Sequence, residues 1–522
     1  MNFSTIDILV FAVYGVLIVT FGLWISREKK GHKKDSADYF LAGKALPWWA
    51  IGASLIASNI SAEQFIGMSG SGYALGLGIA SYEWMGGLTL IVVAKWLLPI
   101  FIEKKIFTLP QFLEIRYDSR IRTILAIFWV FLYTLVNLTS VLYLSSLALS
   151  VVLGISMTES IVGLAVVAVA YSIYGGLKAV AWTDVIQVVF LVIGGLITTY
   201  IALDQVGGDG GPFAGFQILI EKAPGKFDMI LSKDNPFFSD LPGIGVLIGG
   251  MWIANISYFG CNQYIIQRAL AAKNIGEAQK GLAFAGYLKL LLPMIVVIPG
   301  IAAFVLGADV VRNDEAYPWL LSNLVPIGIK GLTFAALIAA ALSSLSSMMN
   351  STATIFTLDV YKPFINPNAS ETKLVNVGRT VGLTAVIVAV LVAQPLLGGE
   401  EQVFQFIQKY TGYVSPGIVV LFLFGLFWKK ASASGALWAA IASVPFSIFV
   451  DLSFPSMPFL NQMGVVFLAL SVLMIIISSL GGGKESPKAI QLNKGLFKTS
   501  PAFNALSMGI ILILAALYVI FW

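Results

Sequence analysis

Apolar stretches long enough to cross a lipid bilayer follow one another along almost the whole chain. A helix needs about 20 apolar residues to span the hydrocarbon core, and lipid offers the backbone no hydrogen-bond partners, so such spans are helical. The sequence therefore predicts an all-α polytopic membrane protein. It has fourteen candidate spans: 6–26, 46–74, 77–101, 121–152, 158–175, 180–203, 242–265, 278–306, 328–357, 375–396, 401–427, 434–451, 458–480 and 502–522.

The composition excludes most other classes. Hydrophobic residues make up 58% of the 522 and charged residues 11%, where a soluble domain has roughly a quarter charged. A soluble enzyme, a nucleic-acid-binding protein and a disordered scaffold are excluded, and an outer-membrane barrel would show alternating strands of about ten residues. The single Cys261 forms no intrachain disulfide, and the single His32 leaves no histidine cluster for a metal.

The basic residues predict the orientation of the spans. Twenty-five of the 32 Lys and Arg residues fall in alternate loops that begin with 27–45, and five fall in the loops between them. By the positive-inside rule the first set faces the cytoplasm, so both termini face outward. This placement explains the pI near 9.0 as topology and contact with anionic lipid. We expect one multi-pass domain, residues 1–522, in the cell membrane.

The second span breaks the rules for a lipid-facing helix. Residues 57–72 contain Asn59, Glu63 and Gln64 together with serines and glycines. Small residues alone would fit a closely packed helix, but ionisable groups at membrane depth mark functional sites. The pattern favours a helix that unwinds against a cavity, where free backbone carbonyls bind a cation.

The seventh span repeats this pattern. The tripeptide Asn-Ile-Ser occurs at 59–61 and again at 255–257, five spans later. Matching interruptions in two halves of a transporter indicate its binding site, and five spans per repeat make the second repeat inverted. Asn255 at mid-span also needs a partner, from protein, ligand or water.

Three other spans carry polar groups with two interpretations each. Glu83 beside Tyr82 is an interfacial anchor or a sugar-binding carboxylate. Lys289 lies among leucines and either snorkels to an interface or pairs inside. Phe404 and Gln408 share one helix face, which suits a polar ligand with an apolar side or ordinary packing.

The ninth and sixth spans carry further oxygen groups. Ser343, Ser347 and Ser351 form a hydroxyl stripe. These serines bond their own helix carbonyls, or they complete a hard-oxygen cage for Na⁺ against an unwound segment. Asp184 is interpreted mainly as a cap of the helix that follows 175–176, with a gating role as the secondary interpretation.

Residues 57–72, 255–268 and 343–352 resemble the solute/sodium symporter family, most closely its bacterial sodium/sugar members. So do 39–43, 182–184 and 410–412. The resemblance implies fourteen helices with a LeuT-type core of two inverted five-helix repeats and discontinuous helices. It divides the chain into a leading helix (6–26), a first repeat (46–203), a second repeat (242–427) and three trailing helices (434–522).

The resemblance also implies residue roles. The galactose-contacting positions are Gln64, Glu83, Asn255, Lys289 and Gln408. Tyr258 closes the sugar from the inside, and Met68, Tyr82 and Phe404 are apolar lids on the other side. Sodium is held by the carbonyls of Ala57, Ile60 and Ala340 and the hydroxyls of Ser343 and Ser344; Asp184 lies on its exit route, with Asn137 and Tyr133 as polar neighbours of the site. Phe259 departs from the family pattern, which has tryptophan there.

We therefore expect a sodium-coupled symporter that imports a neutral monosaccharide, galactose or glucose, by alternating access. Na⁺ is the coupling ion, and we expect no other cofactor and no enzyme activity, because no nucleophile–base pair is visible. The alternative is a sodium- or proton-coupled symporter of another small polar solute, such as sialic acid or an amino acid. A carboxylated substrate would favour arginine, whereas Glu63 and Glu83 favour a neutral polyol. Glu63, Glu83 or Asp184 would carry a coupling proton. The expected partners are sugar, Na⁺ and the bilayer, without nucleic acid; a homodimer stays open.

Overall fold

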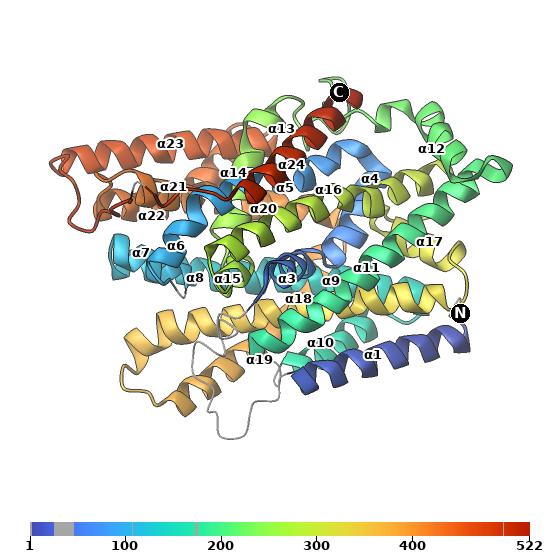
Figure 1. The fold of residues 1–522 in the computed structure, drawn as a ribbon, viewed down its shortest axis with the longest axis horizontal. Helices are drawn as coiled ribbons and strands as arrows, with labels where there is room; N and C mark the ends of the chain where they lie inside the picture. The colour runs from blue at the N-terminus through green and yellow to red at the C-terminus, as the bar shows by residue number, and fades with distance from the viewer. Residues whose placement is uncertain (1–2, 26–45, 107, 173–175, 494) are drawn as a thin grey trace.

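The computed structural model describes residues 3–25, 46–106, 108–172, 176–493 and 495–522, and within these ranges the chain forms helices and no β-strand. The helices run mostly along one axis of the molecule (Figure 1). Nine segments of the described chain are long and apolar enough to cross a membrane, or ten if one bent pair counts as a span. The prediction of an all-α polytopic membrane protein is confirmed at this level. The 27–45 loop and the 39–43 motif lie outside the described residues.

Each of these nine segments overlaps one predicted span. Proline inside α16 and α22 interrupts the helical ladder without ending the helix. The helices are α5 (Ser81–Val92) with α6 (Leu98–Glu103), α8 (Ser119–Phe131) with α9 (Thr139–Leu153), α11 (Gly176–Gly207) with α12 (Gly211–Lys222), α16 (Ile275–Val305), α18 (Ile329–Ile355) with the π-helix η9 (Phe356–Ile365), α19 (Glu371–Leu397), α22 (Ala433–Ser453), α23 (Phe459–Leu480) and α24 (Pro501–Ile520).

The other five predicted spans are short, bent or broken. The helices α1 (Thr5–Ile25) and α10 (Met157–Ser172) have apolar parts of fewer than 18 described residues. The bent pair is α20 (Val403–Gly412) and α21 (Ser415–Phe427), which meet at 48°. The predicted spans 46–74 and 242–265 are interrupted, so neither contains one long helix. The count of fourteen stays a prediction.

The first interruption lies where the sequence predicts it. Helix α3 (Trp48–Asn59) ends before Ile60, which is extended, and a π-helix η2 (Glu63–Met68) continues into α4 (Ser69–Leu75). The Ser61 hydroxyl accepts from the Glu63 amide at 3.2 Å, and the Gln64 side chain accepts from the Ser61 amide at 3.0 Å. This reciprocal pair resembles a capping box and starts a new helix inside the membrane segment.

The second interruption lies five residues beyond the predicted place. Residues 255–257 are helical within α14 (Gly250–Gly260), so the expectation of a break there is wrong. The helix ends before Cys261, and α15 (Gln263–Leu270) follows extended Asn262. A Cβ at Gly260 would lie 2.7 Å from the Leu97 side chain, so glycine lets the end of α14 lie close to Leu97. The short α13 (Gly245–Ile248) precedes α14.

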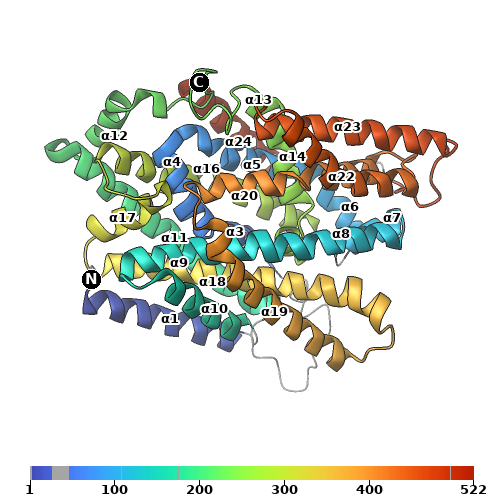
Figure 2. The ribbon, with the colours of Figure 1, turned by 180° about the vertical axis from the view of Figure 1, so that it is seen from behind.

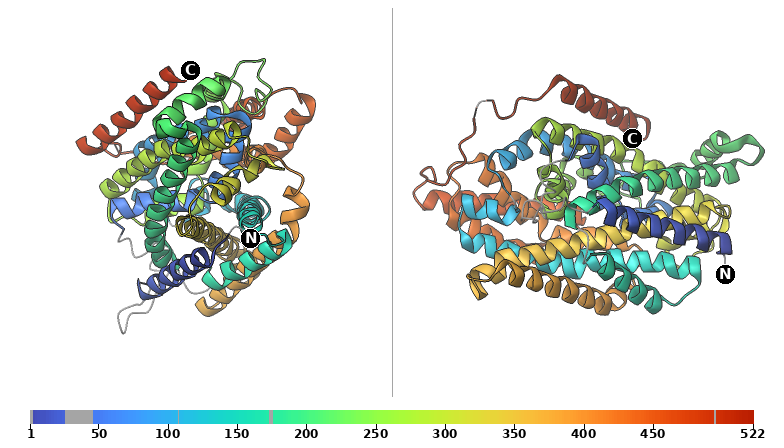
Figure 3. Two further views of the ribbon diagram at one scale, coloured as in Figure 1. Left: turned by 90° about the vertical axis from the view of Figure 1, so that its right-hand side faces the viewer. Right: turned by 60° about the horizontal axis from the view of Figure 1, so that its bottom comes forward.

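Both interrupted segments lie in the interior of the molecule. Helix α3 is buried from Ala50 to Asn59 and packs against α11, α15, α16 and α18. Seen from behind, α8, α9 and α19 cover this core (Figure 2). Helix α24 lies along an outer edge and is joined to α23 by a long linker (Figure 3).

The two ends of the bundle carry different loops. The chain's N-terminus, α12 and the short α17 (Ala316–Asn323) lie at one end (Figure 1). The short α7 (Leu109–Arg116) and the beginning of α22 lie at the other end. The predicted external loops that carry α12 and α17 therefore share one end, and the predicted cytoplasmic segments at α7 and the beginning of α22 share the opposite end.

Candidate functional site

A cavity lies between the two interrupted segments. Polar and aromatic side chains from eight helical elements line it, which is the usual composition of a small-molecule site. All five positions predicted to contact sugar line this one space: Gln64, Glu83, Asn255, Lys289 and Gln408. Three of the four predicted lid residues line it as well: Tyr82, Tyr258 and Phe404.

Glu83 and Lys289 form a buried ion pair in the wall of the cavity. The Lys289 ammonium donates to the Glu83 carboxylate, and both side chains are less than 5% exposed. The ammonium also lies 5.2 Å from the centre of the Phe259 ring, within range of a cation–π contact. Lys289 therefore pairs inside rather than snorkelling, and burial excludes the interfacial anchor as the role of Glu83.

A tryptophan holds the two helices of this pair together. The Trp84 indole donates to the Leu290 carbonyl at 3.3 Å, so the residues next to Glu83 and Lys289 are themselves bonded. Across the cavity, a Cβ at Gly86 would lie 3.3 Å from the Asn255 amide oxygen. Glycine at this position therefore lets α14 approach α5 and brings Asn255 to the same space as the ion pair.

The capping contact fixes the orientation of the Gln64 side-chain amide. A backbone N–H only donates, so the Gln64 oxygen must face Ser61, and its NH₂ group is left to donate elsewhere. The neighbouring Glu63 also lines the cavity and accepts a short hydrogen bond from Ser140 of α9. The helix break thus places an amide donor and a carboxylate on the cavity wall.

A chain of hydroxyl and amide groups supports Tyr258. The Asn59 amide donates to the Tyr258 hydroxyl at 3.0 Å, and the Tyr264 hydroxyl lies 2.7 Å from it. The predicted site neighbour Tyr133 donates to Asn262 at 2.7 Å and accepts from the Gln263 amide at 3.2 Å. Tyr133 therefore stabilises the second helix break from behind rather than lining the cavity.

Two aromatic rings of the cavity wall lie near the starts of α5 and α20. Tyr82 and Phe404 meet edge to face with ring centres 5.2 Å apart. Met68 lies fully buried at the end of η2 and does not line the cavity. Asn137 is likewise buried behind the site, where its carbonyl accepts from Ser140.

The predicted sodium residues lie on α3 and α18, which pack against each other. Ala57, Ile60, Ala340, Ser343 and Ser344 are all buried. The Ser61 amide, which would extend the α3 ladder to the Ala57 carbonyl, bonds Gln64 instead. The Ser344 hydroxyl has no hydrogen-bond partner among the described residues. Freed carbonyls and an unpaired buried hydroxyl are hard-oxygen ligands of the kind that suits Na⁺.

Asp184 joins these two helices, and the interpretation of it as a helix cap is wrong. Helix α11 begins at Gly176, so Asp184 lies in its interior, where a carboxylate caps no helix end. One carboxylate oxygen accepts from Ser343 of α18 and the other accepts from Ser54 of α3 at 2.8 Å. The Ser343 hydroxyl therefore bonds a carboxylate rather than its own helix.

Sequence reasoning missed the arginine next to this carboxylate. Arg268 of α15 is buried, lies 3.8 Å from Asp184, and donates to the Ser347 hydroxyl at 2.9 Å. Asn59 and Thr411 of the cavity were also not singled out as ligands, although each has an unpaired buried oxygen. A basic residue in the last turn of the short helix that follows the second break was the available signal for Arg268.

Comparison with known proteins assigns the family. Residues 39–443 match the Sodium:solute symporter family. The chain is 55% identical over 99% of its length to the sodium/glucose cotransporter of Vibrio parahaemolyticus, covering 98% of that protein. It is 35% identical to the sodium/myo-inositol cotransporter 2 of Oryctolagus cuniculus, over 83% of this chain and 68% of that one. The chain therefore belongs to the sodium:solute symporter family.

Solved structures share the fold. A Na⁺-coupled sialic acid symporter in a substrate-bound outward-open state matches with a TM-score of 0.77 and 26% identity, over 91% of this chain and 98% of that chain. The nucleobase-cation-symport-1 transporter Mhp1 matches with a TM-score of 0.56 and 13% identity, over 91% and 99% of the two chains. At that identity the second match supports the fold alone. The chain is a multi-pass transporter of this family.

Proposed function

We propose that this chain is a sodium-coupled symporter that imports a neutral monosaccharide by alternating access. The observation that carries the proposal is the cavity at the two helix breaks, where five polar groups and several aromatic rings line one space. Carboxylate, amide and ammonium groups bond sugar hydroxyls, and the rings pack on the apolar face of a pyranose. The similarity to a sodium/glucose cotransporter supports the same substrate class.

The charge balance of the cavity favours a neutral polyol over a carboxylated solute. The Lys289 ammonium is already paired with Glu83, so a substrate carboxylate would compete with a buried anion for it. A sugar hydroxyl, by contrast, donates to Glu83 and accepts from Lys289 without separating the charges fully. Two relatives are named for glucose and for myo-inositol, and both of these compounds are neutral polyols.

Sodium would bind between α3 and α18 and act on the sugar site through the first helix break. The chain between Ala57 and Gln64 contains candidate ligands for both, with the cap at Ser61 between them. Each ligand shifts the conformational equilibrium by its differential affinity for the two states. Loss of Na⁺ then weakens sugar binding by the same coupling free energy.

We further propose fourteen spans in the plasma membrane, with a core of two inverted repeats, 46–203 and 242–427, and both termini outside. The supporting observations are the two interruptions five predicted spans apart, and the position of the N-terminus at the same end as α12 and α17. The single leading helix and three trailing helices flank this core.

Equilibrium binding of labelled galactose to the purified chain tests the proposal. We expect saturable binding in Na⁺ whose affinity falls about 5- to 150-fold in K⁺, because the two sites are coupled by about 1 to 3 kcal/mol. Unlabelled glucose should displace galactose, whereas sialic acid and proline should not. Sodium-dependent binding that sialic acid or proline displaces better than glucose would favour the alternative solutes. Binding that depends on pH and not on Na⁺ would favour proton coupling through Glu63, Glu83 or Asp184.

A further inference from the structure

Two residues of the connecting loops, Lys226 and Asp314, contact the second half of the first broken span. That half, η2 and α4, carries Gln64 at the cavity and ends in loops at the α12 and α17 end. On its side toward α20, Gly67 lies against Phe404, and a Cβ there would lie 3.1 Å from the Phe404 Cβ. Separation of η2 and the α4 that continues it from α20 would therefore open the cavity at this end.

Lys226 holds the end of α4. Its ammonium donates to the carbonyls of Tyr73 and Ala74 at 2.8 Å each and lies 4.0 Å from the centre of the Phe304 ring. These are the last carbonyls of a helix, which lack intrahelical partners and carry the negative end of the helix dipole. Burial lowers the pKa of Lys226 to about 8, so the ammonium stays mostly charged at pH 7.

The backbone of Lys226 fits the same helix end closely. Gly76 follows α4 with φ +87°, and a Cβ there would lie 2.3 Å from the Lys226 carbonyl oxygen. Side chains larger than hydrogen are excluded by this contact and by the backbone conformation. The loop residue is therefore seated on α4 by its backbone and bonded to it by its side chain.

Asp314 holds α4 from another side and joins it to α20. One carboxylate oxygen accepts from the Val403 amide, the first of α20, at 3.0 Å. The other has no hydrogen-bond partner among the described residues, and it would lie 2.4 Å from a Cβ at Gly70. This single buried side chain thus contacts both helices that must separate.

We propose that Lys226 and Asp314 form an external clamp, in which Lys226 holds the end of α4 in place and Asp314 joins α4 to α20, and that this clamp keeps the cavity closed to the outside until it is released. The inference rests on the proposed function, which places the α12 and α17 end of the molecule outside the cell. It adds the loop contacts that set the balance between the outward-open and inward-open states. Neither residue contacts the cavity. Removing the clamp therefore changes access from outside without removing a ligand of sugar or sodium.

Labelling of a reporter cysteine tests the clamp. The only native cysteine is replaced by Cys261→Ala, and Met68→Cys places a thiol in a fully buried position on the closed side of the cavity. A membrane-impermeant maleimide is added at pH 7 to intact cells without sodium or sugar. We expect Lys226→Met to raise the labelling rate about tenfold, the shift expected when a charge-assisted hydrogen bond is lost.

Matched control variants distinguish release of the clamp from a general loss of stability. Lys222→Met, on an exposed residue at the end of α12, should leave labelling unchanged, and Lys226→Arg should keep it low. Labelling in Lys226→Met that equals the Lys222→Met rate overturns the proposal. If Lys226→Met does not yield monodisperse protein, Asp314→Asn replaces it with the same two outcomes. The assay needs no transport, so its result is independent of whether galactose is a substrate.

Discussion

The buried pair of Glu83 and Lys289 determines what the cavity accepts. Two opposite charges in a low-dielectric wall are tolerated because each satisfies the other. Their side chains come from segments 206 residues apart in sequence. The pair therefore links the architecture of the core to the chemistry of the ligand.

Removing one member of this pair should destabilise the protein by more than the loss of its side-chain packing alone. We expect Lys289→Met to lower stability by about 3 to 5 kcal/mol, because Glu83 is left charged and buried. The double variant Glu83→Gln with Lys289→Met should recover most of the stability and none of the sugar binding. Thermal unfolding in detergent and galactose binding measure the two effects separately.

A surface lysine on the same helix serves as the control. Lys280 lies on α16 with Lys289 and is 3.7 Å from Glu277, and its side chain is 37% exposed. Lys280→Met should leave thermal unfolding almost unchanged, because exposed ion pairs contribute little. If Lys289→Met is no more harmful than Lys280→Met, the buried pair does not have the role assigned here.

Ser344 should act on sodium alone. Its unpaired buried hydroxyl lies on α18, next to Ser343, which is already bonded to Asp184. We expect Ser344→Ala to raise the sodium concentration for half-maximal galactose binding at least about tenfold, the effect of one lost hydrogen bond or ligand to a charged group. Ser145→Ala is the control, because that buried hydroxyl bonds the Val141 carbonyl of its own helix. Equal sodium dependence in both variants would remove Ser344 from the site.

At the scale of single elements, Asp118 fixes the start of α8. Its carboxylate accepts from the Arg120 and Ile121 amides, and its side chain pairs with the Arg120 guanidinium. Partial burial alone would raise the pKa of Asp118, but these hydrogen bonds and the charge of Arg120 hold it below its usual range. The folded state thus binds this proton more weakly than the unfolded state does.

The sign of the pH effect follows from that difference. The contribution of Asp118 is present at pH 7 and is lost as the pH falls below about 4, through its lowered folded pKa. Asp118→Ala should lower stability by about 1 kcal/mol at pH 7, the usual cost of an N-cap. The deficit should shrink toward pH 3, as measured by thermal unfolding at both pH values. A deficit of equal size at both values would contradict the assignment.

Much of the element pattern follows from the sequence, because apolar length and misplaced polar groups are local signals. The break after Asn59 was predicted from residues that cannot face lipid, and the Ser61 and Gln64 cap explains it. The second break lies beyond the tripeptide, where Tyr133 from a distant helix bonds Asn262 and Gln263, and no local pattern reveals that contact. The interpretation of Asp184 as a helix cap is wrong for the same reason, since its hydrogen-bond partners lie on two other helices.

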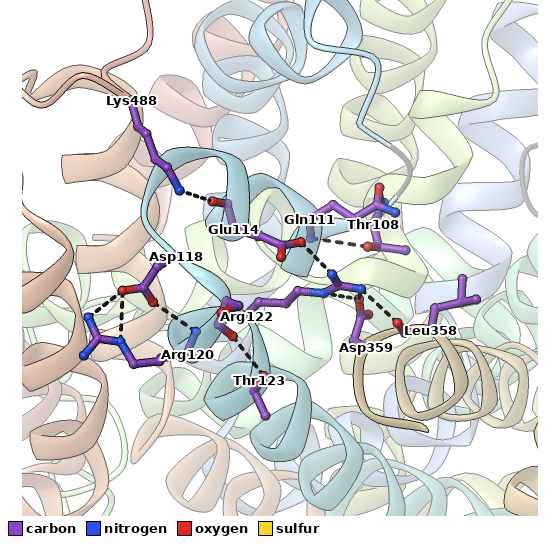
Figure 4. Close-up of polar contacts among 11 residues, drawn as sticks. Thr108, Gln111, Glu114, Asp118, Arg120, Arg122, Thr123, Leu358, Asp359 and Lys488 are labelled. Atoms are coloured by element: carbon purple, nitrogen blue, oxygen red, sulfur yellow. Dashed lines mark hydrogen bonds and ion pairs between the residues drawn. The ribbon is translucent and has the colours of Figure 1, made fainter. Parts of the chain in front are cut away.

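At the scale of the whole molecule, a polar cluster ties distant segments together at the end that carries α7 (Figure 4). Arg122 donates to Glu114 at 2.5 Å, to Asp359 at 2.8 Å and to the Leu358 carbonyl at 2.8 Å. Lys488 of the linker before α24 donates to the Tyr117 carbonyl at 2.8 Å. The cluster therefore joins α7, α8, η9 and the linker.

Arg122 should be the residue on which this cluster depends. The Asp359 side chain is fully buried, so Arg122→Met leaves an uncompensated carboxylate and should cost about 3 to 5 kcal/mol. Arg120→Met, two residues away, removes an exposed guanidinium and should change thermal unfolding little. Similar unfolding temperatures for the two variants would show that the cluster does not stabilise this end of the molecule.

The central claim, sodium-driven sugar import, is tested most directly by uptake of labelled galactose into proteoliposomes. An inward Na⁺ gradient is compared with an equal K⁺ gradient at pH 7, for the native chain and for Ser343→Ala with Ser344→Ala. We predict accumulation in the native chain with Na⁺ only, abolished by excess glucose and lost in the double variant. Equal uptake in Na⁺ and K⁺, or undiminished Na⁺-dependent uptake in the double variant, would contradict the account.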